Sequence, residues 1–583
     1  MEIPRFGRVF FASDDLASRI GGGSLGGKAE GLVRIHEALQ ARFGRSPVRD
    51  VDVAIPRMVV LATDAFDRFM GQDDLYAVAL SDIPDERIAH AFQKVDLPTE
   101  LLGDLRALVE EAHTPLAVRS SSLLEDALAH PFAGVYETKM VPNQDLDPAV
   151  RFRALVEAIK LVYASAFFRG ARTYRRAIGA ADRDEKMAVL IQEVVGVRHG
   201  DRFYPHISAV GRSFSYYPTG YSRPEDGVIQ LALGLGKSIV DGGVCWTYSP
   251  RHPTAPPPFG SVRRMLQETQ SRFWAVNMGK PPAYDPVAET EYLVEAGLQE
   301  AEQDRTLRWV ASTYDAASDR LSPGTGREGP RVLDFAPLLR LREWEINEAL
   351  AALLALAEES LGMPVEIEVA ATLPASPEGR LRMGLVQVRA MAAPGEETPV
   401  EEADLAGPDV LLGSCHVMGN GVSDTVQDVV YTKPGTFDFS RSREVAVELD
   451  AWNRALMDDG RPYMLIGFGR WGSADPWLGV PVTWGQVAGA RVIVEATRPG
   501  QRIEPSQGSH FFHNVSSLGV VYISTGATEP TDLDWELLAA RDAVAETALL
   551  RHVRLERPLH VRVDGRSGRG YVRWAPPSPG DHR

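Results

Sequence analysis

Two short segments near the middle of the chain alternate apolar and polar residues, which is the pattern of β-strands. They are Val365–Val369 and Leu385–Ala390. A strand sends alternate side chains to opposite faces. The apolar residues of both segments can therefore pack into a core, and their polar residues gather on the other face. Those polar residues are Glu366, Glu368, Gln387 and Arg389.

The chemistry of these four side chains depends on whether the two strands are neighbours. If they are, carboxylate, amide and guanidinium groups meet in one pocket. Hard oxygen ligands suit magnesium and a planar cation suits phosphate, so the set would suit a magnesium-bound nucleotide. The alternative is a pair of ordinary amphipathic strands with a solvated polar face.

The N-terminal part predicts a mixture of helices and strands. The glycine-rich segment Gly21–Lys28 leads into a helical pattern with apolar residues on one face. Ile55–Thr63 predicts a strand, and Asp64 is predicted to cap a helix that carries two phenylalanines. Further along, the chain predicts strands at Pro115–Ser121 and Ala188–Val195, a long helix over residues 151–178, and a mostly helical stretch over 261–361 with a break near 322–330.

A change of composition separates a second part of the chain. Residues 393–407 are acidic and contain two prolines, which indicates a linker. Residues 408–555 alternate strands and helices, and a hairpin is expected around residues 564–565. We therefore predict one domain over 1–392, a linker over 393–407, a small α/β domain with a terminal hairpin over 408–574, and a tail over 575–583.

Composition narrows the function classes. The chain has 583 residues, 44% hydrophobic and 24% charged, with a net charge of −17. These values are typical of a globular protein, and they argue against a general binder of nucleic acid or of an anionic membrane. The two cysteines, Cys245 and Cys415, lie outside any CxxC pattern, so a cytoplasmic location is expected. No signal peptide or membrane span is expected either.

The glycine-rich segment ending in Lys28 is the first candidate anion site. Glycines allow backbone N–H groups to approach an anion, and the following helix points its positive end at it. It is not a Walker A loop, because Ala29 follows the lysine. The alternative is a flexible loop before a helix.

Three more segments carry candidate nucleotide contacts. Arg119, at the end of a strand and followed by three serines, could clamp phosphate, or it could pair with Glu125 or Asp126. Gln192 and Glu193 end an apolar strand whose edge could bind adenine or simply meet solvent. The glycine pair before Lys237 is by default a turn.

In this order, these segments resemble the nucleotide-binding domain of phosphoenolpyruvate synthase and pyruvate phosphate dikinase, which has an ATP-grasp-like fold. The matching stretches are Gly26–Ala29, Ala117–Ser121, Phe132–Gly134, the strand at Gln192, Gly234–Gly236, Glu366–Glu368 and Gln387–Arg389. The resemblance covers residues 15–392. It implies an α+β fold with a two-lobed ATP-grasp-like domain, followed by a smaller α/β domain like the swivelling phosphohistidine domain of those enzymes.

The resemblance also implies roles for single residues. Lys28 and Arg119 would hold ATP phosphates, Glu368 and Gln387 would hold Mg²⁺, and Arg389 would contact the transferring phosphate. The sequence departs from the family at Lys237, where glutamate is usual, and at Gln230, where an acid is usual. Glu366–Val369 and Ser208–Ser213 also differ from the family patterns.

The carrier histidine of those enzymes has one principal candidate here. Gly508–His510 lies between two predicted strands, and imidazole is a good nucleophile near neutral pH. The alternative is that His510 and His513 belong to an aromatic cluster. His416 and His513 are further candidates for the carrier.

The main hypothesis is an ATP-dependent phosphotransferase of the dikinase type, a kinase resembling phosphoenolpyruvate synthase (pyruvate, water dikinase). It would move phosphate from Mg-ATP to a histidine or to an unknown small-molecule or protein acceptor, with AMP as the nucleotide product. We do not expect a complete phosphoenolpyruvate synthase, because no room remains for the large barrel after residue 555. The altered acids favour the alternative, a nucleotide-binding sensor or scaffold without turnover. A third hypothesis is an ATP-grasp ligase.

Overall fold

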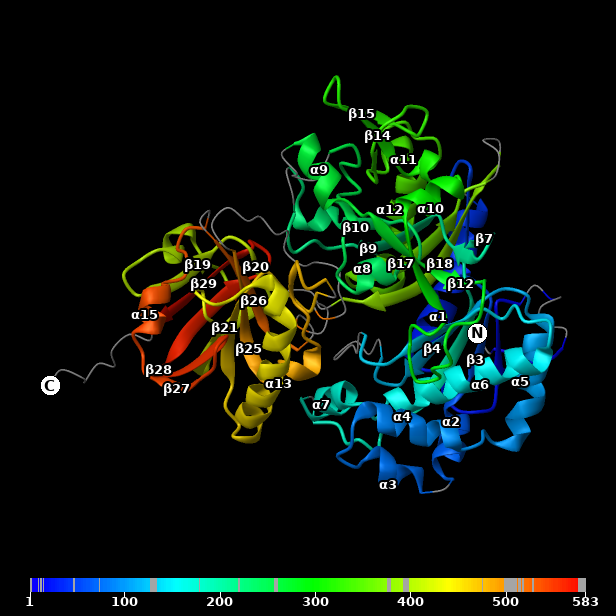
Figure 1. The fold of residues 1–583 in the computed structure, drawn as a ribbon, viewed down its shortest axis with the longest axis horizontal. Helices are drawn as coiled ribbons and strands as arrows, with labels where there is room; N and C mark the ends of the chain where they lie inside the picture. Colours follow the sequence, from blue (N-terminus) through cyan, green and yellow to red (C-terminus); the bar gives the residue numbers. More distant parts are fainter. Residues whose placement is uncertain are drawn as a thin grey trace. The chain divides into compact units, whose positions relative to one another are not determined.

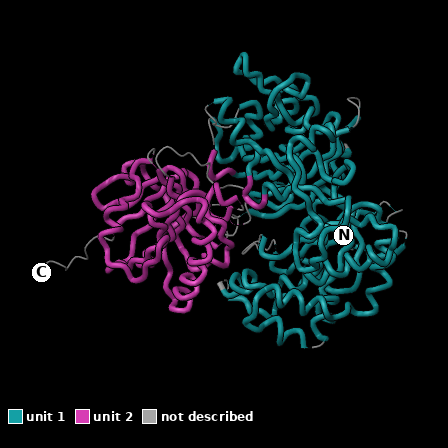
Figure 2. The backbone as a smooth tube through the Cα atoms, viewed as in Figure 1, with its two compact units in different colours: residues 1–214, 219–239, 244–391 teal, residues 215–218, 240–243, 392–583 magenta. Residues whose placement is uncertain are grey.

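The computed structural model describes the chain from residue 3 to residue 574, with internal gaps. The gaps are residues 9, 11–12, 14, 46–47, 73, 126–133, 178, 219–220, 256–260, 375–378, 392–397, 474, 498–510, 512–514, 516–517 and 527–528. The chain divides into two compact units, shown in Figure 2. Unit 1 comprises Met1–Phe214, Thr219–Ile239 and Val244–Met391, and unit 2 comprises Ser215–Pro218, Val240–Gly243 and Ala392–Arg583.

The first layer of unit 1 is a five-stranded sheet, in the order β1-β3-β6-β4-β5. Its central strands are buried, as expected where helices cover a sheet, and β4 alone among them carries a run of buried polar residues, Arg119–Ser122. The predicted strands at 115–121 and 188–195 are confirmed as two of its three inner strands. The strands are β1 (Ala17–Ile20), β3 (Met58–Leu61), β6 (Met187–Glu193), β4 (Leu116–Ser122) and β5 (Thr138–Val141).

Helices from the first 177 residues surround this sheet (Figure 1). The predicted cap at Asp64 is wrong, because the helix starts at Thr63 after Ala62 and Asp64 instead pairs with Arg68 inside it. The long helix predicted over residues 151–178 is two helices. The second one starts at Arg169, whose N–H donates a hydrogen bond to the Asp85 carboxylate. The helices are α2 (Thr63–Met70), α3 (Leu75–Ala79), α4 (Asp85–Lys94), α5 (Thr99–Glu111), α6 (Pro148–Ser165) and α7 (Arg169–Ala177).

The second layer of unit 1 is a six-stranded sheet, in the order β11-β10-β9-β17-β18-β2. Helix α1 (Gly27–Arg45) contacts strands of both sheets, and α12 (Ile346–Leu361) packs on the second. Helix α12 ends at Gly362, whose left-handed φ of 72° suits glycine. The strands are β11 (Trp246–Tyr248), β10 (Val228–Ala232), β9 (Ile207–Arg212), β17 (Val365–Thr372), β18 (Leu381–Ala390) and β2 (Val51–Ala54).

The stretch over 261–361 is not mostly helical. Short strands form two small sheets there, because pairing with distant segments decides strand formation more than local propensity does. Of the described helices in this stretch, only α12 is long. The short elements of this stretch are α9 (Val262–Glu268), α10 (Leu298–Gln303), α11 (Ala336–Leu339), β12 (Arg272–Asn277), β13 (Leu293–Gly297), β14 (Ser312–Asp315), β15 (Arg320–Pro323) and β16 (Arg331–Val332). Three elements precede it in the chain, and the two strands among them belong to the sheet of β12 and β13: β7 (Val197–His199), β8 (Arg202–Tyr204) and α8 (Lys237–Val240).

Unit 2 is built on one nine-stranded mixed sheet, whose middle strands β21, β22, β25 and β26 run parallel. Helix α13 (Ser442–Asp458) connects the first two of these, as parallel pairing requires a crossover. The strands are β19 (Val410–Ser414), β20 (Val417–Met418), β21 (Asn420–Thr432), β22 (Tyr463–Phe468), β25 (Ala490–Ala496), β26 (Val521–Thr525), β27 (Ala543–Glu546), β28 (Leu550–Asp564) and β29 (Arg569–Trp574).

The two ends of this sheet are joined by a very short connection. Strands β19 and β20 are the first and last in the strand order, yet only Cys415 and His416 separate them. Ser414 Oγ donates to the Ser524 carbonyl, so the β19 edge also reaches β26. The sheet therefore curls until its edges meet. The remaining elements of unit 2 are α15 (Trp535–Ala539), β23 (Arg470–Trp471) and β24 (Gly479–Val480).

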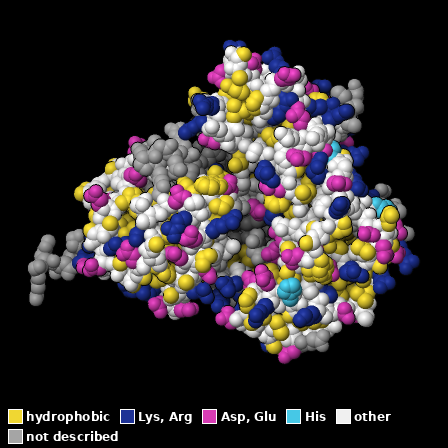
Figure 3. All heavy atoms as spheres, in the orientation of Figure 1, with side chains coloured by type: hydrophobic (Ala, Val, Ile, Leu, Met, Phe, Trp, Pro, Cys, Tyr) yellow, Lys and Arg dark blue, Asp and Glu magenta, His cyan; other side chains and the backbone are white. Residues whose placement is uncertain are grey.

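The described surfaces carry charges of both signs. Figure 3 shows acidic and basic side chains interspersed over the visible face of each unit. None of the helices within the described ranges is long and apolar enough to span a membrane.

Candidate functional site

The glycine-rich segment packs its last turn against strand β4. Gly26 has a φ of +74°, and a Cβ added there would lie 1.6 Å from the Ser121 carbonyl oxygen, so only glycine fits. Ser121 Oγ accepts from the Ala29 N–H at 3.2 Å, which fixes the start of α1 on the strand. The helix start predicted as an anion site is thus anchored on β4, with Lys28 in its first turn.

The ammonium of Lys28 is held inside unit 1. Its Nζ lies 2.5 Å from Glu125 Oε1 and 3.0 Å from Ser120 Oγ. Glu125 is 1% exposed and also accepts from the Ser122 N–H. Glu125 therefore pairs with Lys28 and not with Arg119, while Asp126 lies outside the described residues.

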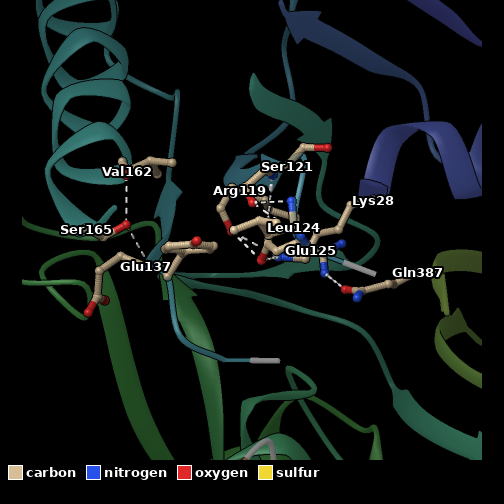
Figure 4. A network of polar contacts seen from close by, with 12 residues as sticks. Lys28, Arg119, Ser121, Leu124, Glu125, Glu137, Val162, Ser165 and Gln387 are labelled. Atoms are coloured by element: carbon tan, nitrogen blue, oxygen red, sulfur yellow. Dashed lines mark hydrogen bonds and ion pairs between the residues drawn. The ribbon is translucent and has the colours of Figure 1, made fainter. Parts of the chain in front are cut away.

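Arg119 joins the two sheets of unit 1 (Figure 4). Its Nη1 donates to Gln192 Oε1 at 3.3 Å within the first sheet and to the Val386 carbonyl at 3.0 Å in the second. Its Nη2 donates to Gln387 Oε1 at 2.5 Å and lies 3.4 Å from Glu368 Oε2. Residues from β4, β6, β17 and β18 thus meet at one guanidinium.

The two alternating strands, whose pairing the sequence left open, are neighbours and are paired antiparallel. Glu366 lies opposite Arg389, and Glu368 lies opposite Gln387. Glu366, Gln387 and Arg389 are each at most 4% exposed, which excludes an ordinary amphipathic pair with a solvated polar face. The expected gathering of carboxylate, amide and guanidinium groups is therefore confirmed.

Arg389 forms an ion pair with Glu366, and Glu366 also pairs with an arginine on a third strand. Glu366 Oε1 accepts from Arg389 Nη2, and Glu366 Oε2 accepts from Arg212 Nε at 2.6 Å. Arg212 lies on β9, and its Nη1 reaches Gln230 Oε1 on β10 at 3.5 Å. The polar face of the second sheet therefore extends over four adjacent strands.

Other predicted residues lie apart from this cluster. Glu193 follows Gln192 on β6 but points the other way, where Thr114 Oγ1 donates to it at 3.1 Å. Lys237 pairs with Glu289 at 3.2 Å. Gly234 has a φ of +84°, and its carbonyl accepts from Ser208 Oγ, so this glycine serves close packing.

Two buried donors of the cluster bear on the ligand that it fits. The Nε2 atoms of Gln192 and Gln387 are buried, and no described residue accepts a hydrogen bond from either. Unpaired buried donors next to cationic groups suit the oxygens of a phosphate chain. For magnesium, Glu368 offers a carboxylate that is 18% exposed at its side chain. In the described ranges, no group of three or more His, Cys, Asp or Glu side chains is placed to hold a metal.

Sequence reasoning gave no role to two residues that complete the site. Glu125 appeared only as a possible partner of Arg119, and Arg212 only inside a departing segment. Arg212 could have been suspected from its place at the end of the uncharged segment Ile207–Gly211, because a charged residue next to such a segment can mark a site. For Glu125, the sequence holds no comparable signal.

The predicted carrier His510 and its neighbour His513 lie outside the described residues. Phe132 and Ala133 of the matching stretch lie outside them as well. His416 is described, and its Nδ1 lies 2.6 Å from Glu529 Oε1. The hydrogen bond to Glu529 raises the pKa of His416 above its ordinary value, against the effect of burial. Its side chain is 52% exposed, so Nε2 can meet a substrate.

Unit 2 also contains a buried carboxyl group on a central strand. Glu495, on β25, is 3% exposed and accepts from the Tyr522 hydroxyl at 2.7 Å. Burial raises the pKa of Glu495 to about 7, although the Tyr522 hydrogen bond and the Arg470 charge oppose the rise. This group therefore titrates near neutral pH.

Comparison with known proteins agrees with the arrangement in unit 1. The family described as pyruvate phosphate dikinase, AMP/ATP-binding domain, matches residues 23–406, more than half of the chain. A rifampicin phosphotransferase from Streptomyces sviceus is 29% identical over 205 residues, which are 33% of this chain. The match covers only 22% of that relative's length. On the extent of the family match, this chain belongs to the pyruvate phosphate dikinase AMP/ATP-binding domain family.

Proposed function

We propose that this protein is an ATP-dependent phosphotransferase of the dikinase type, in which unit 1 binds Mg-ATP. The observation that carries the proposal is the cluster around Arg119, where residues from four strands of two sheets meet. Phosphoryl transfer depends mainly on positioning and on charges around the moving oxygens. A buried set of guanidinium, ammonium and amide donors suits that task.

The residues of the cluster have distinct proposed roles. Lys28, at the start of α1, would exchange Glu125 for a phosphate oxygen. Arg389, oriented by Glu366, would face the transferring phosphate. Glu368, whose carboxylate is a hard oxygen ligand, would hold magnesium. Magnesium held there with the nucleotide would supply positive charge that offsets the negative charge of the phosphate oxygens.

The acceptor of the phosphate is proposed to be a histidine of this chain or a separate molecule. His510 remains the first candidate by resemblance. His416 is the second, because Glu529 holds its Nδ1 and leaves Nε2 for attack on phosphorus. The rifampicin phosphotransferase relative makes a small-molecule acceptor a reasonable class as well.

One observation favours the alternative, a nucleotide-binding sensor or scaffold. Gln230 stands where the family has an acid, and it contacts Arg212 on the polar face. This exchange of an acid for an amide leaves fewer metal ligands, which would slow catalysis more than binding.

Labelled ATP separates these functions. The protein would be incubated with Mg²⁺ and with ATP labelled in the α- or the γ-phosphate, and AMP, ADP and acid-labile protein phosphate would be followed. The transferase predicts AMP together with protein phosphate that is lost in His510→Ala or in His416→Ala. His560→Ala is the matched control, because its Nδ1 also lies 2.6 Å from a carboxylate, that of Asp424.

Two outcomes would contradict the transferase. Tight ATP binding with no product would support the scaffold. ADP formed only after carboxylate and amine acceptors are added would support a ligase.

A further inference from the structure

Arg119 orients the side-chain amides of Gln192 and Gln387. Both amides present Oε1 to its guanidinium, at 3.3 Å for Gln192 and 2.5 Å for Gln387. A guanidinium has only donors, so an amide beside it must offer its carbonyl oxygen and turn its NH₂ group away. The orientation of both amides is therefore fixed by chemistry.

The turned-away NH₂ groups have no protein acceptor. Gln192 is 1% exposed and Gln387 2% exposed, and no acceptor for either Nε2 is found among the described residues. Leaving a buried donor unsatisfied is costly, and such groups in native proteins call for an explanation. A ligand that supplies oxygen acceptors at this place provides one.

The same orientation bears on magnesium. Oε1 of Gln387 already accepts from Arg119, so a metal on that oxygen would lie beside a guanidinium cation. Nε2, the other polar atom, is a donor and cannot coordinate a metal. Gln387 as placed therefore does not fit a metal ligand, whereas the carboxylate of Glu368 does.

The neighbouring charge indicates the class of ligand. The Arg119 guanidinium, which both amides contact through Oε1, carries a full positive charge. Two amide donors beside the Arg119 guanidinium match the anionic oxygens of a phosphate chain better than an uncharged carbonyl group.

We infer that Gln192 and Gln387 are paired amide donors to phosphate oxygens of the nucleotide, that Arg119 is their positioning residue, and that Gln387 is not a metal ligand. This inference rests on the proposed ATP binding by unit 1. On this inference, Glu368 is a ligand of the metal and Gln387 is not. It also requires that the nucleotide keep contacts with the protein when no divalent cation is present.

Calorimetric titration with ATP, in EDTA and in Mg²⁺, tests the inference on the full chain. Gln387→Glu exchanges the NH₂ donor for a carboxylate oxygen, and Gln192→Glu does the same on the other strand. Each should weaken ATP binding about tenfold or more in both buffers, because a donor to a charged oxygen is lost. Gln267→Glu, on the exposed face of α9, adds the same charge outside the site and should leave binding unchanged.

A carboxylate that replaces a real metal ligand would behave differently. If Gln387→Glu left binding in EDTA unchanged and tightened binding in Mg²⁺, Gln387 would be a metal ligand and the inference would be overturned. Gln387→Met is a second variant, in which the new side chain has no polar group. It separates the loss of the amide from a folding defect that the glutamate alone would cause. It should weaken binding equally in both buffers, and a loss confined to Mg²⁺ would again overturn the inference.

Failure of the underlying function gives another result. If the unaltered protein bound no ATP in either buffer, the nucleotide site itself would be wrong. Mn²⁺ binding followed by electron paramagnetic resonance adds a readout that is independent of turnover. With ATP present, Glu368→Gln should lose the bound Mn²⁺ signal, and Gln387→Met should keep it at a matched degree of ATP saturation.

Discussion

Replacement of Arg119 by methionine tests whether this guanidinium holds the two sheets of unit 1 together. The change keeps much of the apolar length and removes all the donors. Three buried acceptors would lose their partner: Gln192 Oε1, the Val386 carbonyl and Gln387 Oε1. Each costs about 1–3 kcal/mol when left unsatisfied. The Glu368 contact adds less, because its distance is 3.4 Å and the Glu368 side chain is 18% exposed.

We therefore expect Arg119→Met to lower the free energy of unfolding of unit 1 by about 3 kcal/mol or more, which is the lower limit for three unsatisfied acceptors. The measurement is urea-dependent hydrogen exchange, followed on peptides from β6 and β18, so that unit 1 is observed separately from unit 2. Arg380→Met is the control, since Arg380 pairs with Asp52 on the second sheet but is 43% exposed. An exposed pair contributes less than about 1 kcal/mol. Equal effects of the two substitutions would refute the bridging role.

Three further predictions concern other parts of the chain. Gly26→Ala should destabilise unit 1 by about 2–4 kcal/mol, because of the clash with the Ser121 carbonyl and the positive φ; unchanged thermal unfolding would contradict this. Glu495 keeps its proton to about pH 7 when folded, against 4.5 as its ordinary value. The folded state therefore binds more protons in that interval, and stability should fall by about 3 kcal/mol as the pH rises from 4.5 to 8. Glu495→Gln should remove this part of the fall, measured by denaturation at both pH values, and an identical fall in the variant would show that Glu495 is not the source. In NMR titration, the pKa of His416 should lie above 6.5 and should decrease in Glu529→Gln; no decrease would show that Glu529 does not hold the ring.

Local pattern was enough to predict the strands that carry the polar face. Alternation in Val365–Val369 predicted that Glu366 and Glu368 share a face, and alternation in Leu385–Ala390 predicted the same of Gln387 and Arg389, as the strand pairing shows. Such patterns are reliable because one face of a strand must be buried for the sheet to be stable. The glycine run before Lys28 was also informative, because the backbone at Gly26 has a positive φ and packs so closely on β4 that a side chain would not fit.

The partners within the site could not be predicted in the same way. Arg119 and Gln387 are 268 residues apart in the chain, and Arg212 and Glu366 are 154 apart. Contacts at such separations depend on how sheets stack, which no local pattern encodes. The short strands of Arg272–Asn277 and Ser312–Asp315 were missed for the same reason, because distant pairing and not propensity forms them.

The cap at Asp64 shows a smaller kind of error. An aspartate before a helical pattern is a good capping signal. Here the helix begins one residue earlier, and Arg68, one turn later, pairs with the carboxylate at 2.6 Å. Sequence reasoning identified the helix but could not distinguish a cap from a first-turn ion pair.

The most direct test of the nucleotide site is a crystal structure of the protein with Mg²⁺ and an ATP analogue that cannot transfer its γ-phosphate. The account predicts phosphate oxygens within hydrogen-bond distance of Lys28 Nζ and of the Nε2 atoms of Gln192 and Gln387, with the metal on Glu368. A nucleotide bound elsewhere on the chain, with Lys28 still on Glu125 and both amides unpaired, would contradict it.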